Sequence, residues 1–367
     1  MSVVRFLVLG GFLGSGKTTA ILRLAQGHVA AGRRVGIIAN DLGKGLVDTQ
    51  TYLAHGLPVE EMAGVCFACR FDDLIAAAGR LQDGHQPDVL LAEPAGSCTD
   101  IVSRVVVPLK ELYADRFHMA PYVTLLDPQR ALEALGGKGP ARFSAKVTYL
   151  YKMQQNEADV VAINKADTLR PDEVRTLEEL VGRNLPQAEI IVVSARTGLG
   201  FDRLAALLEA DQPAGRNPIR PGTRGTAASA AGDARLAWLN ATWRLTAASP
   251  FDPDALLLDL AHSLQTELRT IDAEPAHVKM TLQSADTLAL ANLVGSDRPA
   301  ELSQAAGASV NQGELTLNAR VEAGLRALRH CVERALAATA DRFAVRVTCV
   351  RMENKLPKLS DAASASS

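Results

Sequence analysis

The residues with the clearest chemical use form a glycine-rich run near the N-terminus. Residues 11–18, Gly-Phe-Leu-Gly-Ser-Gly-Lys-Thr, match the pattern G-x-x-x-x-G-K-[ST]. The glycines let backbone N–H groups curl around a phosphate, and a helix that starts at the run adds its positive end. We expect Lys17 to bridge the β- and γ-phosphates of a nucleotide and Thr18 to offer its hydroxyl to magnesium. The predicted nucleotide contacts in this loop are Gly11, Gly14, Ser15, Gly16, Lys17, Thr18 and Thr19.

A second motif indicates which base the nucleotide carries. Residues 164–167, Asn-Lys-Ala-Asp, directly follow an apolar run over 159–163. The Asp167 carboxylate can accept hydrogen bonds from N1–H and the exocyclic amine of guanine, whereas adenine would leave it unpaired. Ser194 and Ala195 follow the next apolar run and fit a backbone contact to the guanine oxygen. The sequence therefore predicts GTP as the ligand. The predicted contacts to the base are Asn164, Lys165, Asp167, Ser194 and Ala195.

Carboxylates near the γ-phosphate are needed to hold magnesium and to orient water. Glu93 closes an apolar run and can hold a magnesium-bound water or orient the nucleophile. Gly96 could bring a backbone N–H to the γ-phosphate, which would make this segment a nucleotide-sensitive switch. Asp41 and Asp48 belong to a second candidate switch over 40–48. Each of these acids could instead be a solvated loop carboxylate. The predicted catalytic set is Lys17, Asp41, Asp48 and Glu93.

Two cysteines have the spacing of a metal site or a redox site. Cys66 and Cys69 form C-x-x-C just before a helical pattern, and Arg70 together with the helix end would favour their thiolate forms. Cys98, two residues past Gly96, is a candidate third sulfur. Sulfur ligands favour zinc or copper(I), and cobalt is also possible. A redox pair and a pair of buried thiols are the alternatives to a metal site.

The remaining cysteines and the histidines add little to this set. Cys331 and Cys349 lie on the apolar patterns of a helix and a strand, and we expect both to be packing residues. Among the seven histidines, His55 is a possible metal ligand because it lies near the C-x-x-C segment.

These motifs need a scaffold, and the hydrophobic pattern up to residue 210 predicts one. Short continuous apolar runs alternate with longer amphipathic stretches, as expected of strands covered on both faces with helices between them. This series indicates an α/β fold, the doubly wound, mostly parallel sheet of P-loop NTPases. The predicted strands are 3–9, 35–39, 88–92, 122–126, 159–163 and 189–193, and the predicted helices are 17–31, 71–81, 100–114 and 171–182.

The composition changes after this series. Residues 212–233 are rich in Gly, Ala, Ser and Pro without a hydrophobic period, and we expect a linker there. Residues 234–355 then have the pattern β-α-β-β-β-α-β, a smaller C-terminal α+β domain. The small polar residues of 356–367 predict a flexible tail. The P-loop domain is accordingly predicted over 1–211.

The composition also excludes several classes of protein. The 367 residues carry a formal net charge of −2, with 47% hydrophobic and 22% charged residues, as in an ordinary globular protein. There is no basic stripe and only 4% of the residues are aromatic, so nucleic acid is not an expected partner. No apolar run is long enough to span a membrane, and five cysteines in this length do not form a disulfide framework. We expect a cytoplasmic protein with reduced thiols and no membrane partner.

Taken in their order along the chain, the motifs resemble those of the CobW-type metallochaperone GTPases, whose wider class includes UreG and HypB. The similar segments are GFLGSGKTT, the C-x-x-C segment that continues into RFDDL, EPAG and NKAD, and NDLGKGLVD is similar to a segment of UreG. The resemblance implies a GTPase with Thr18, Asp41 and Glu93 around magnesium. It also implies a divalent metal, zinc or cobalt, held at the cysteine motif. GTP hydrolysis would release this metal to a client metalloenzyme or a cobalamin-related pathway, and the wider class implies a nucleotide-dependent homodimer.

Two features depart from the pattern of that family. The family's cysteine motif is C-x-C-C, and here Ala68 takes the place of the middle cysteine. The histidine-rich stretch of many relatives is also absent. These departures favour an alternative, a metal-independent activase or binding module that docks on a partner enzyme under the control of GTP.

Overall fold

The chain divides into two units, one ending at Gly232 and one beginning at Asp233. The computed structural model describes residues 3–41, 47–64, 66–136, 142–210, 213–218, 232–285 and 287–355, without the side chains of Asp41, Asn354 and Lys355. The predicted tail and most of the predicted linker lie outside these residues. The predicted domain limits therefore stay a prediction.

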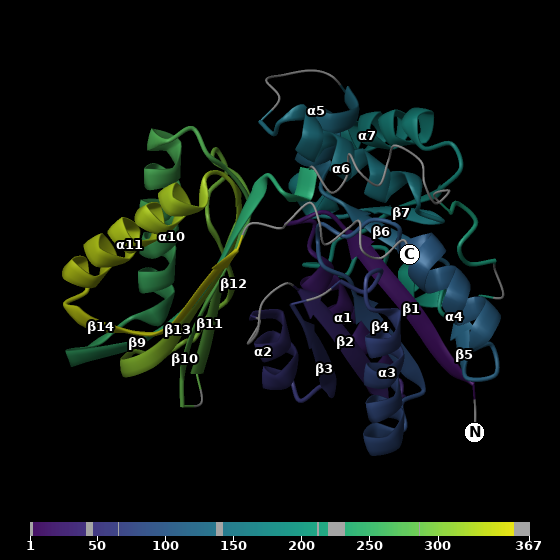
Figure 1. Cartoon of the computed structure of the whole chain (residues 1–367), viewed down its shortest axis with the longest axis horizontal. Coiled ribbons are helices and arrows are strands. Elements are labelled where there is room, and N and C mark those ends of the chain that lie inside the picture. Colours follow the sequence, from purple (N-terminus) through teal and green to yellow (C-terminus); the bar gives the residue numbers. More distant parts are fainter. Residues whose placement is uncertain are drawn as a thin grey trace. The chain divides into compact units, whose positions relative to one another are not determined.

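A parallel sheet forms the centre of the first unit (Figure 1). Among the described residues its strand order is β3-β2-β4-β1-β6-β7-β8, and β5 also pairs with β1. Every one of these pairings is parallel, which confirms the doubly wound α/β fold of P-loop proteins that the sequence predicts. The strands are β1 (Val4–Gly11), β2 (Val35–Asp41), β3 (Val59–Ala63), β4 (Val89–Glu93), β5 (Phe117–Met119), β6 (Val123–Leu126), β7 (Val160–Ile163) and β8 (Glu189–Val192).

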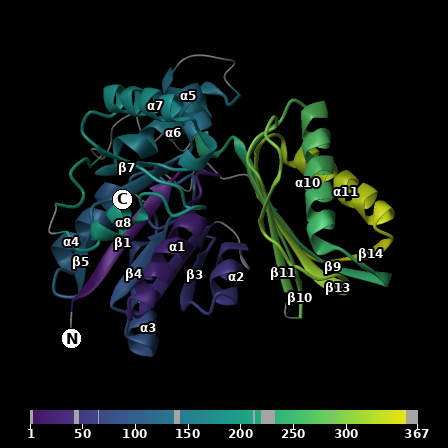
Figure 2. The ribbon, with the colours of Figure 1, turned by 180° about the vertical axis from the view of Figure 1, so that it is seen from behind.

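Helices connect these strands and cover both faces of the sheet. Along β1, Leu7 and Leu9 enter one apolar cluster while Phe6 and Val8 enter another, because neighbouring side chains of a strand point to opposite faces. The first cluster includes side chains of α1 and α8, and the second includes side chains of α3 and η1. Figure 1 is viewed from the side of α3 and α4, and Figure 2 from the side of α1 and α8. The helices are α1 (Lys17–Ala30), α2 (Val47–Ala54), α3 (Phe71–His85), η1 (Val102–Val106), α4 (Val107–Leu112), α5 (Pro128–Gly136), α6 (Ala145–Asn156), η2 (Ala166–Thr168), α7 (Pro171–Asn184) and α8 (Phe201–Ala206).

Some elements of this unit differ from the sequence prediction. Strand β3 lies at an edge and carries Glu60 and Glu61, and β5 has only three residues, so neither forms a continuous apolar run. The predicted helix over 100–114 is a π-helical turn, η1, that continues into α4. It begins late because Asp100 has a φ of +61°, outside the helical region.

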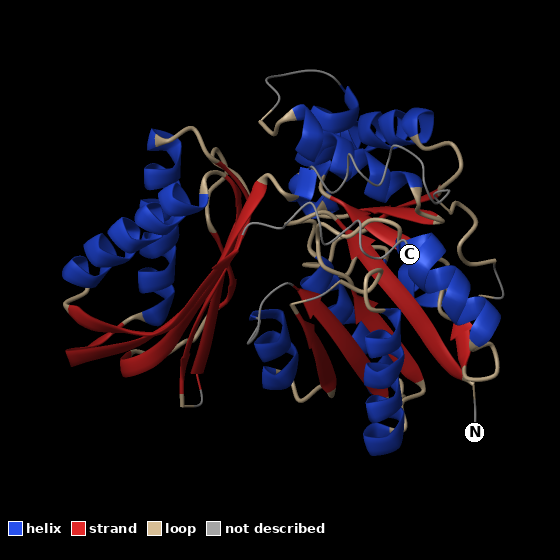
Figure 3. Ribbon diagram, in the orientation of Figure 1, coloured by secondary structure: helices blue, strands red, loops and turns tan. Residues whose placement is uncertain are grey.

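An antiparallel sheet and two helices form the second unit, an α+β arrangement as predicted (Figure 3). The strand order among its described residues is β12-β11-β10-β13-β9-β14. Both helices pack their leucines against one face of the sheet, where they share a cluster with alternate residues of β9, β10 and β13. The elements are β9 (Leu236–Phe251), α10 (Pro253–Thr270), β10 (Glu274–Ser284), β11 (Thr287–Leu293), β12 (Glu301–Gln304), β13 (Val310–Glu322), α11 (Leu325–Arg342) and β14 (Val345–Lys355).

The second unit holds the two cysteines that we expected to be packing residues. Cys331 lies in the apolar cluster beneath α11, as predicted. Cys349 is exposed, against the prediction, because β14 is an edge strand whose pairing with β9 shifts register between Cys349 and Arg351. In the described part of the whole chain, no helix has the length and apolar character needed to cross a membrane.

Candidate functional site

The phosphate loop joins β1 to α1 at the carboxyl edge of the parallel sheet, where ligands of doubly wound folds bind. Gly11 and Gly16 have φ angles of +136° and +94°, a region that favours glycine. A Cβ on Gly11 would lie 2.5 Å from the carbonyl oxygen of Leu125. A Cβ on Gly16 would lie 2.5 Å from Nδ2 of Asn164. The shape of the loop therefore requires glycine at both positions.

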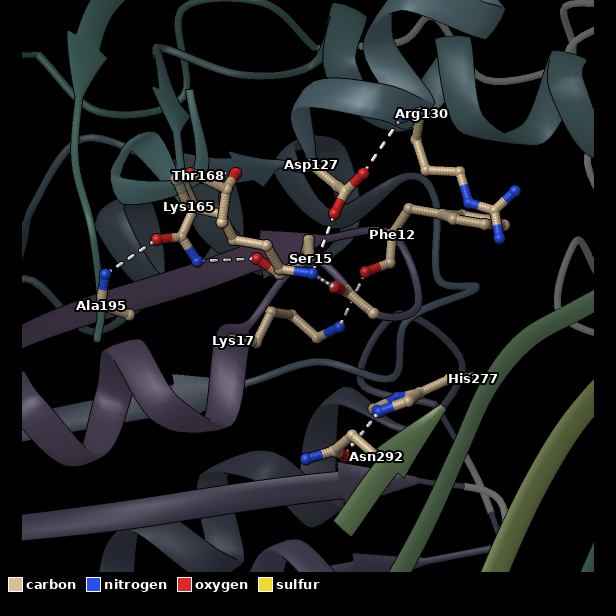
Figure 4. Close-up of polar contacts among 12 residues, drawn as sticks. Phe12, Ser15, Lys17, Asp127, Arg130, Lys165, Thr168, Ala195, His277 and Asn292 are labelled. Atoms are coloured by element: carbon tan, nitrogen blue, oxygen red, sulfur yellow. Dashed lines mark hydrogen bonds and ion pairs between the residues drawn. The ribbon is translucent and has the colours of Figure 1, made fainter. Parts of the chain in front are cut away.

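The buried Lys17 side chain lies against this loop (Figure 4). Its ammonium donates to the carbonyl oxygen of Gly11 at 3.0 Å and, at 3.4 Å, to that of Phe12. The other predicted contacts follow the loop along the chain: Gly14 and Ser15 are buried within it, and Thr19 is exposed in the first turn of α1. The structure thus brings a lysine ammonium and the N-terminus of a helix to one loop, an arrangement suited to phosphate.

Thr18 on α1 contacts side chains from two other elements. Its hydroxyl oxygen, on α1, lies 2.7 Å from Oδ1 of Asp48 on α2 and 3.0 Å from Oε1 of Glu93 at the end of β4. A hydroxyl and two carboxylates are the oxygen ligands that Mg²⁺ prefers, directly or through its waters. The side chain of Asp41, the other predicted acid, lies outside the described residues. The donor set that remains fits a magnesium ion beside the phosphate loop.

Tyr52 belongs to the same group, although the sequence analysis did not include it. Its hydroxyl donates to Oε2 of Glu93 at 2.5 Å, and its side chain is fully buried. Burial, followed by the negative charges of Glu93 and Asp48, raises the pKa of Tyr52 well above its usual range. The available signal was its spacing from Asp48, four residues apart on one helix, but the hydrophobic pattern predicted no helix there.

Asn164 connects the phosphate loop with the predicted base-binding segment. Its Nδ2 donates to the carbonyl oxygen of Ser15 at 2.8 Å, and its Oδ1 accepts from the N–H of Ala195 at 2.9 Å. Asp167 is exposed, and its Oδ1 accepts from the hydroxyl of Ser194 at 2.6 Å. The residues predicted at the base therefore lie together, with the Asp167 carboxylate accessible.

Two further polar side chains hold this segment, and both were missed from sequence. Arg23 on α1 donates to the carbonyl oxygens of Ala195 and Arg196, each at 2.6 Å. Asp127, buried after β6, pairs with the ammonium of Lys165 at 2.9 Å, and the same ammonium donates to the carbonyl oxygen of Gly14 at 2.9 Å (Figure 4). Lys165 therefore braces the phosphate loop.

The segment after Glu93 passes close to the phosphate loop. A Cβ on Gly96 would lie 2.6 Å from Cδ2 and 3.0 Å from the backbone nitrogen of Leu13, so only glycine fits this approach. Gln154, at the end of α6, donates to the carbonyl oxygens of Gly96 and Cys98 at 2.9 and 2.8 Å. The predicted switch segment is thus held at its start by a buried amide.

Glu157 holds the far end of the same segment. Its carboxylate accepts from the N–H groups of Asp100 and Val102 at 2.7 and 3.0 Å, where η1 begins. Burial raises the pKa of Glu157 to about 8, although the two N–H groups favour the charged form. Neither Gln154 nor Glu157 could be identified from sequence, because their partners lie more than fifty positions away.

The cysteine segment differs from the sequence prediction. Cys66 and Cys69 are joined by a disulfide, with their Cα atoms 5.1 Å apart, where reduced thiols were expected. Cys98 is buried in an apolar cluster with Phe67 and Ile101. In the parts of the chain that the structure describes, no three side chains of His, Cys, Asp or Glu are grouped so that they could hold a metal ion. The predicted site of three sulfurs is therefore not formed, and Cys98 serves the core instead.

The histidine named as a possible ligand is not placed in a metal site either. Nδ1 of His55 lies 2.8 Å from the carbonyl oxygen of Thr51, one helical turn earlier. The C-x-x-C pair itself sits in a local turn, in which the N–H groups of Cys69 and Arg70 both donate to the carbonyl oxygen of Cys66. The N–H of Cys69 also lies 3.1 Å from the sulfur of Cys66.

The parallel sheet and the glycine loop define a P-loop nucleotide-binding protein. Residues 5–192 match the family described as the CobW/HypB/UreG nucleotide-binding domain, and the chain belongs to this family. The family resemblance seen in the sequence is confirmed.

The sequence identity between this chain and individual relatives is low. The zinc chaperone YeiR of Escherichia coli is 26% identical over 194 residues, which cover 52% of this chain and 55% of that protein. The zinc-regulated GTPase metalloprotein activator 1 of Dictyostelium discoideum is 24% identical over 213 residues, covering 50% and 44%. The chain spans about half the length of the curated relatives it matches. The Zn(II)-bound YjiA GTPase from E. coli is similar at 16% identity and a TM-score of 0.40, covering 91% of this chain and 99% of that one.

Proposed function

We propose that the protein binds GTP with Mg²⁺ and hydrolyses it to GDP and phosphate. The observation that carries this proposal is the meeting of Thr18, Asp48 and Glu93 beside the phosphate loop. When bound, Mg²⁺ would neutralise the charge that develops on the β- and γ-phosphates. Thr18 would hold the ion, Lys17 would contact the phosphates, and Glu93 would orient the attacking water.

The preference for guanine follows from the base-binding segment. The exposed Asp167 carboxylate would accept from guanine N1–H and the exocyclic amine, as its placement beside Ser194 allows. Arg23 and the side chain of Asn164 fix the backbone of Ala195, because Arg23 donates to its carbonyl oxygen and Asn164 accepts from its N–H. ATP would leave Asp167 without its donors, which is a strong basis for rejection.

Phosphate release from GTP tests this activity. Glu93→Gln should lower kcat about 100-fold while the affinity for GTP is retained, because a carboxylate that orients water acts in the transition state. Asp83→Asn is the matched control, since Asp83 is an exposed acid on α3. Unchanged phosphate release in Glu93→Gln, or equal losses in both variants, would reject the role of Glu93.

We propose further that GTP hydrolysis is coupled to the handling of Zn²⁺ as cargo for a client metalloenzyme. The names of two relatives, a zinc chaperone and a zinc-regulated activator, support this cargo. Cys66 and Cys69 would carry the ion as a reduced pair, since thiolate sulfur is a preferred zinc ligand. Two sulfurs make half of a tetrahedral set, so the client would supply the others and take the ion by ligand exchange. Co²⁺ for a cobalamin-related pathway would use the same sulfurs.

The second candidate function is a GTP-dependent activase that handles no metal. It is favoured by the pairing of Cys66 with Cys69 as a disulfide and by the lack of a third ligand among the described residues. In this case the C-x-x-C turn would be structural, and only the nucleotide state would be read by the partner.

Zinc binding by the full chain separates the two candidates. After reduction and desalting, competition with a chromophoric chelator should find about one Zn²⁺ per chain. The ion should be lost in the Cys66→Ser/Cys69→Ser variant and retained in Cys349→Ser, a control that removes another exposed thiol. GDP should retain less zinc than a non-hydrolysable GTP analogue. Equal zinc in the wild type and the double variant would favour the activase.

A further inference from the structure

We infer that Tyr52 is the positioning residue of Glu93. Through Tyr52, helix α2, which also carries Asp48, connects the two carboxylates of the proposed magnesium site. The inference rests on the proposed GTPase function. It adds a residue whose partner lies 41 positions away in the sequence and which no motif includes.

Both oxygens of the Glu93 carboxylate are contacted, and by different elements. Oε1 lies 3.0 Å from the hydroxyl of Thr18 on α1, and Oε2 accepts from the hydroxyl of Tyr52 on α2 at 2.5 Å. Because the single proton of the Thr18 hydroxyl is shared between Asp48 and Glu93, the hydrogen bond from Tyr52 is the contact that rotation of the carboxylate would break. Tyr52 therefore fixes which oxygen of Glu93 faces Thr18 and the phosphate loop.

A phenol suits this task better than a cation would. Its O–H donates one hydrogen bond to the carboxylate but leaves the negative charge in place. An arginine or lysine here would neutralise the charge that magnesium and its waters need.

Helix α2 carries both contacts to the site. Asp48 and Tyr52 are four residues apart and so lie on one face of the helix, where Asp48 reaches Thr18 at 2.7 Å while Tyr52 reaches Glu93. The helix is anchored on that side by the buried Val47 and Thr51. A shift of α2 would therefore move both acids of the site together, and Tyr52 acts on the reaction through Glu93.

The test is Tyr52→Phe in the full-length chain. Loss of one hydrogen bond to a charged group predicts a fall in kcat of about 10-fold, with KM for GTP within about 2-fold of the wild type. The Mg²⁺ concentration for half-maximal binding of a fluorescent GTP analogue should also rise. The control is Tyr151→Phe, because Tyr151 is a buried tyrosine whose hydroxyl has no hydrogen-bond partner among the described residues.

A double-mutant cycle excludes a purely structural effect. In a Glu93→Gln background, Tyr52→Phe should lower kcat by less than 2-fold, since its partner is already altered. An equal loss in both backgrounds, or an unchanged kcat and Mg²⁺ dependence in the single variant, would overturn the inference. If the wild type released no phosphate, the proposed GTPase function would fail. The Mg²⁺ dependence of nucleotide binding would still decide the role of Tyr52.

Discussion

The nucleotide site and the cysteine segment both belong to the first unit, but different numbers of elements hold their side chains. At the nucleotide site, Thr18, Asp48 and Glu93 come from three elements, and the Thr18 hydroxyl contacts both carboxylates. In the cysteine segment, Cys66 and Cys69 come from one turn of four residues and contact each other. The first is fixed by the packing of the sheet and its helices, and the second needs only local chain geometry.

This difference bears on how each region can act. Side chains fixed by several elements are already oriented for their ligand, so binding costs little reorganisation. A pair held in one turn can change its bonding partner without disturbing the sheet. We therefore expect substitutions to separate the two regions when no nucleotide is bound: those in the nucleotide site should leave the chemistry of the sulfurs intact, and the reverse should also hold.

The largest separation is expected from Lys17→Met. The ammonium would contact two phosphates, and two hydrogen bonds between charged groups contribute about 3 to 6 kcal/mol, or roughly 150- to 25,000-fold in affinity for GTP. Titration with a fluorescent GTP analogue measures this loss. Zinc bound by the reduced chain without nucleotide should stay as in the wild type, and only the effect of the nucleotide on zinc retention should disappear. A loss of zinc in the nucleotide-free variant would show that the cysteine pair depends on the nucleotide site for its structure.

The next effect concerns Glu157, which holds the segment leading away from the nucleotide site. Its pKa of about 8 lies above the value of 4.5 for an ordinary glutamate, so the native state binds a proton more readily than the unfolded state. The stabilisation is complete below pH 4.5 and is lost as the pH rises toward 8. Relative to Glu157→Gln, the wild type should lose on the order of 3 kcal/mol of unfolding free energy between pH 5 and 9.

Denaturant unfolding of the wild type and Glu157→Gln at several pH values measures this difference. Glu179→Gln is the control, because Glu179 is an exposed glutamate on α7. A pH dependence that is the same in the wild type and Glu157→Gln would contradict the assignment of the titration to Glu157. The turn that holds the Cys66–Cys69 disulfide should not contribute to this pH dependence of the unfolding free energy.

A smaller effect is expected from a substitution in the segment that would bind the guanine base. Asp167→Asn should weaken GTP binding about 10- to 100-fold, because a charge-assisted pair of hydrogen bonds is replaced by a neutral one. The same variant should bind xanthosine triphosphate better than the wild type does, since an amide can donate to the xanthine oxygen that replaces the guanine amine. Competition between the two nucleotides measures the change. If Asp167→Asn kept its preference for GTP, the base would be recognised elsewhere.

The sequence predicted those parts of the site that local patterns define. The phosphate loop and the Asn-Lys-Ala-Asp motif depend on glycine spacing and on their place between a strand and a helix. Residues such as Asp127 and Gln154 act through partners distant in sequence, and no local pattern marks them. The same reasoning explains the fold: strands that form continuous apolar or alternating runs were predicted, whereas the edge strands β3 and β12 and the three-residue strand β5 were missed.

At the cysteines the sequence predicted more contacts than the structure forms. The spacing suggested a site of three sulfurs, whereas the structure joins only Cys66 and Cys69. Cys66 and Cys69 are close to each other, as their spacing requires. The proximity of Cys98 to the pair depended on how the segment after Gly96 runs, which sequence does not determine. In the structure Cys98 is buried in the apolar cluster that includes Phe67 and against which Cys66 also packs, but Cys66 is bonded to Cys69.

The smallest expected effect therefore belongs to Cys98→Ala. The thiol is 9% exposed and packs as a small apolar group, so its removal should lower stability by about 1 kcal/mol or less. Zinc bound by the reduced chain should be unchanged, because only Cys66 and Cys69 supply sulfur to the proposed cargo. Chelator competition on Cys98→Ala beside Cys349→Ser measures this. A loss of zinc confined to Cys98→Ala would restore the site of three sulfurs and would join the cysteine segment to the nucleotide-sensitive segment, ending the separation of the two regions.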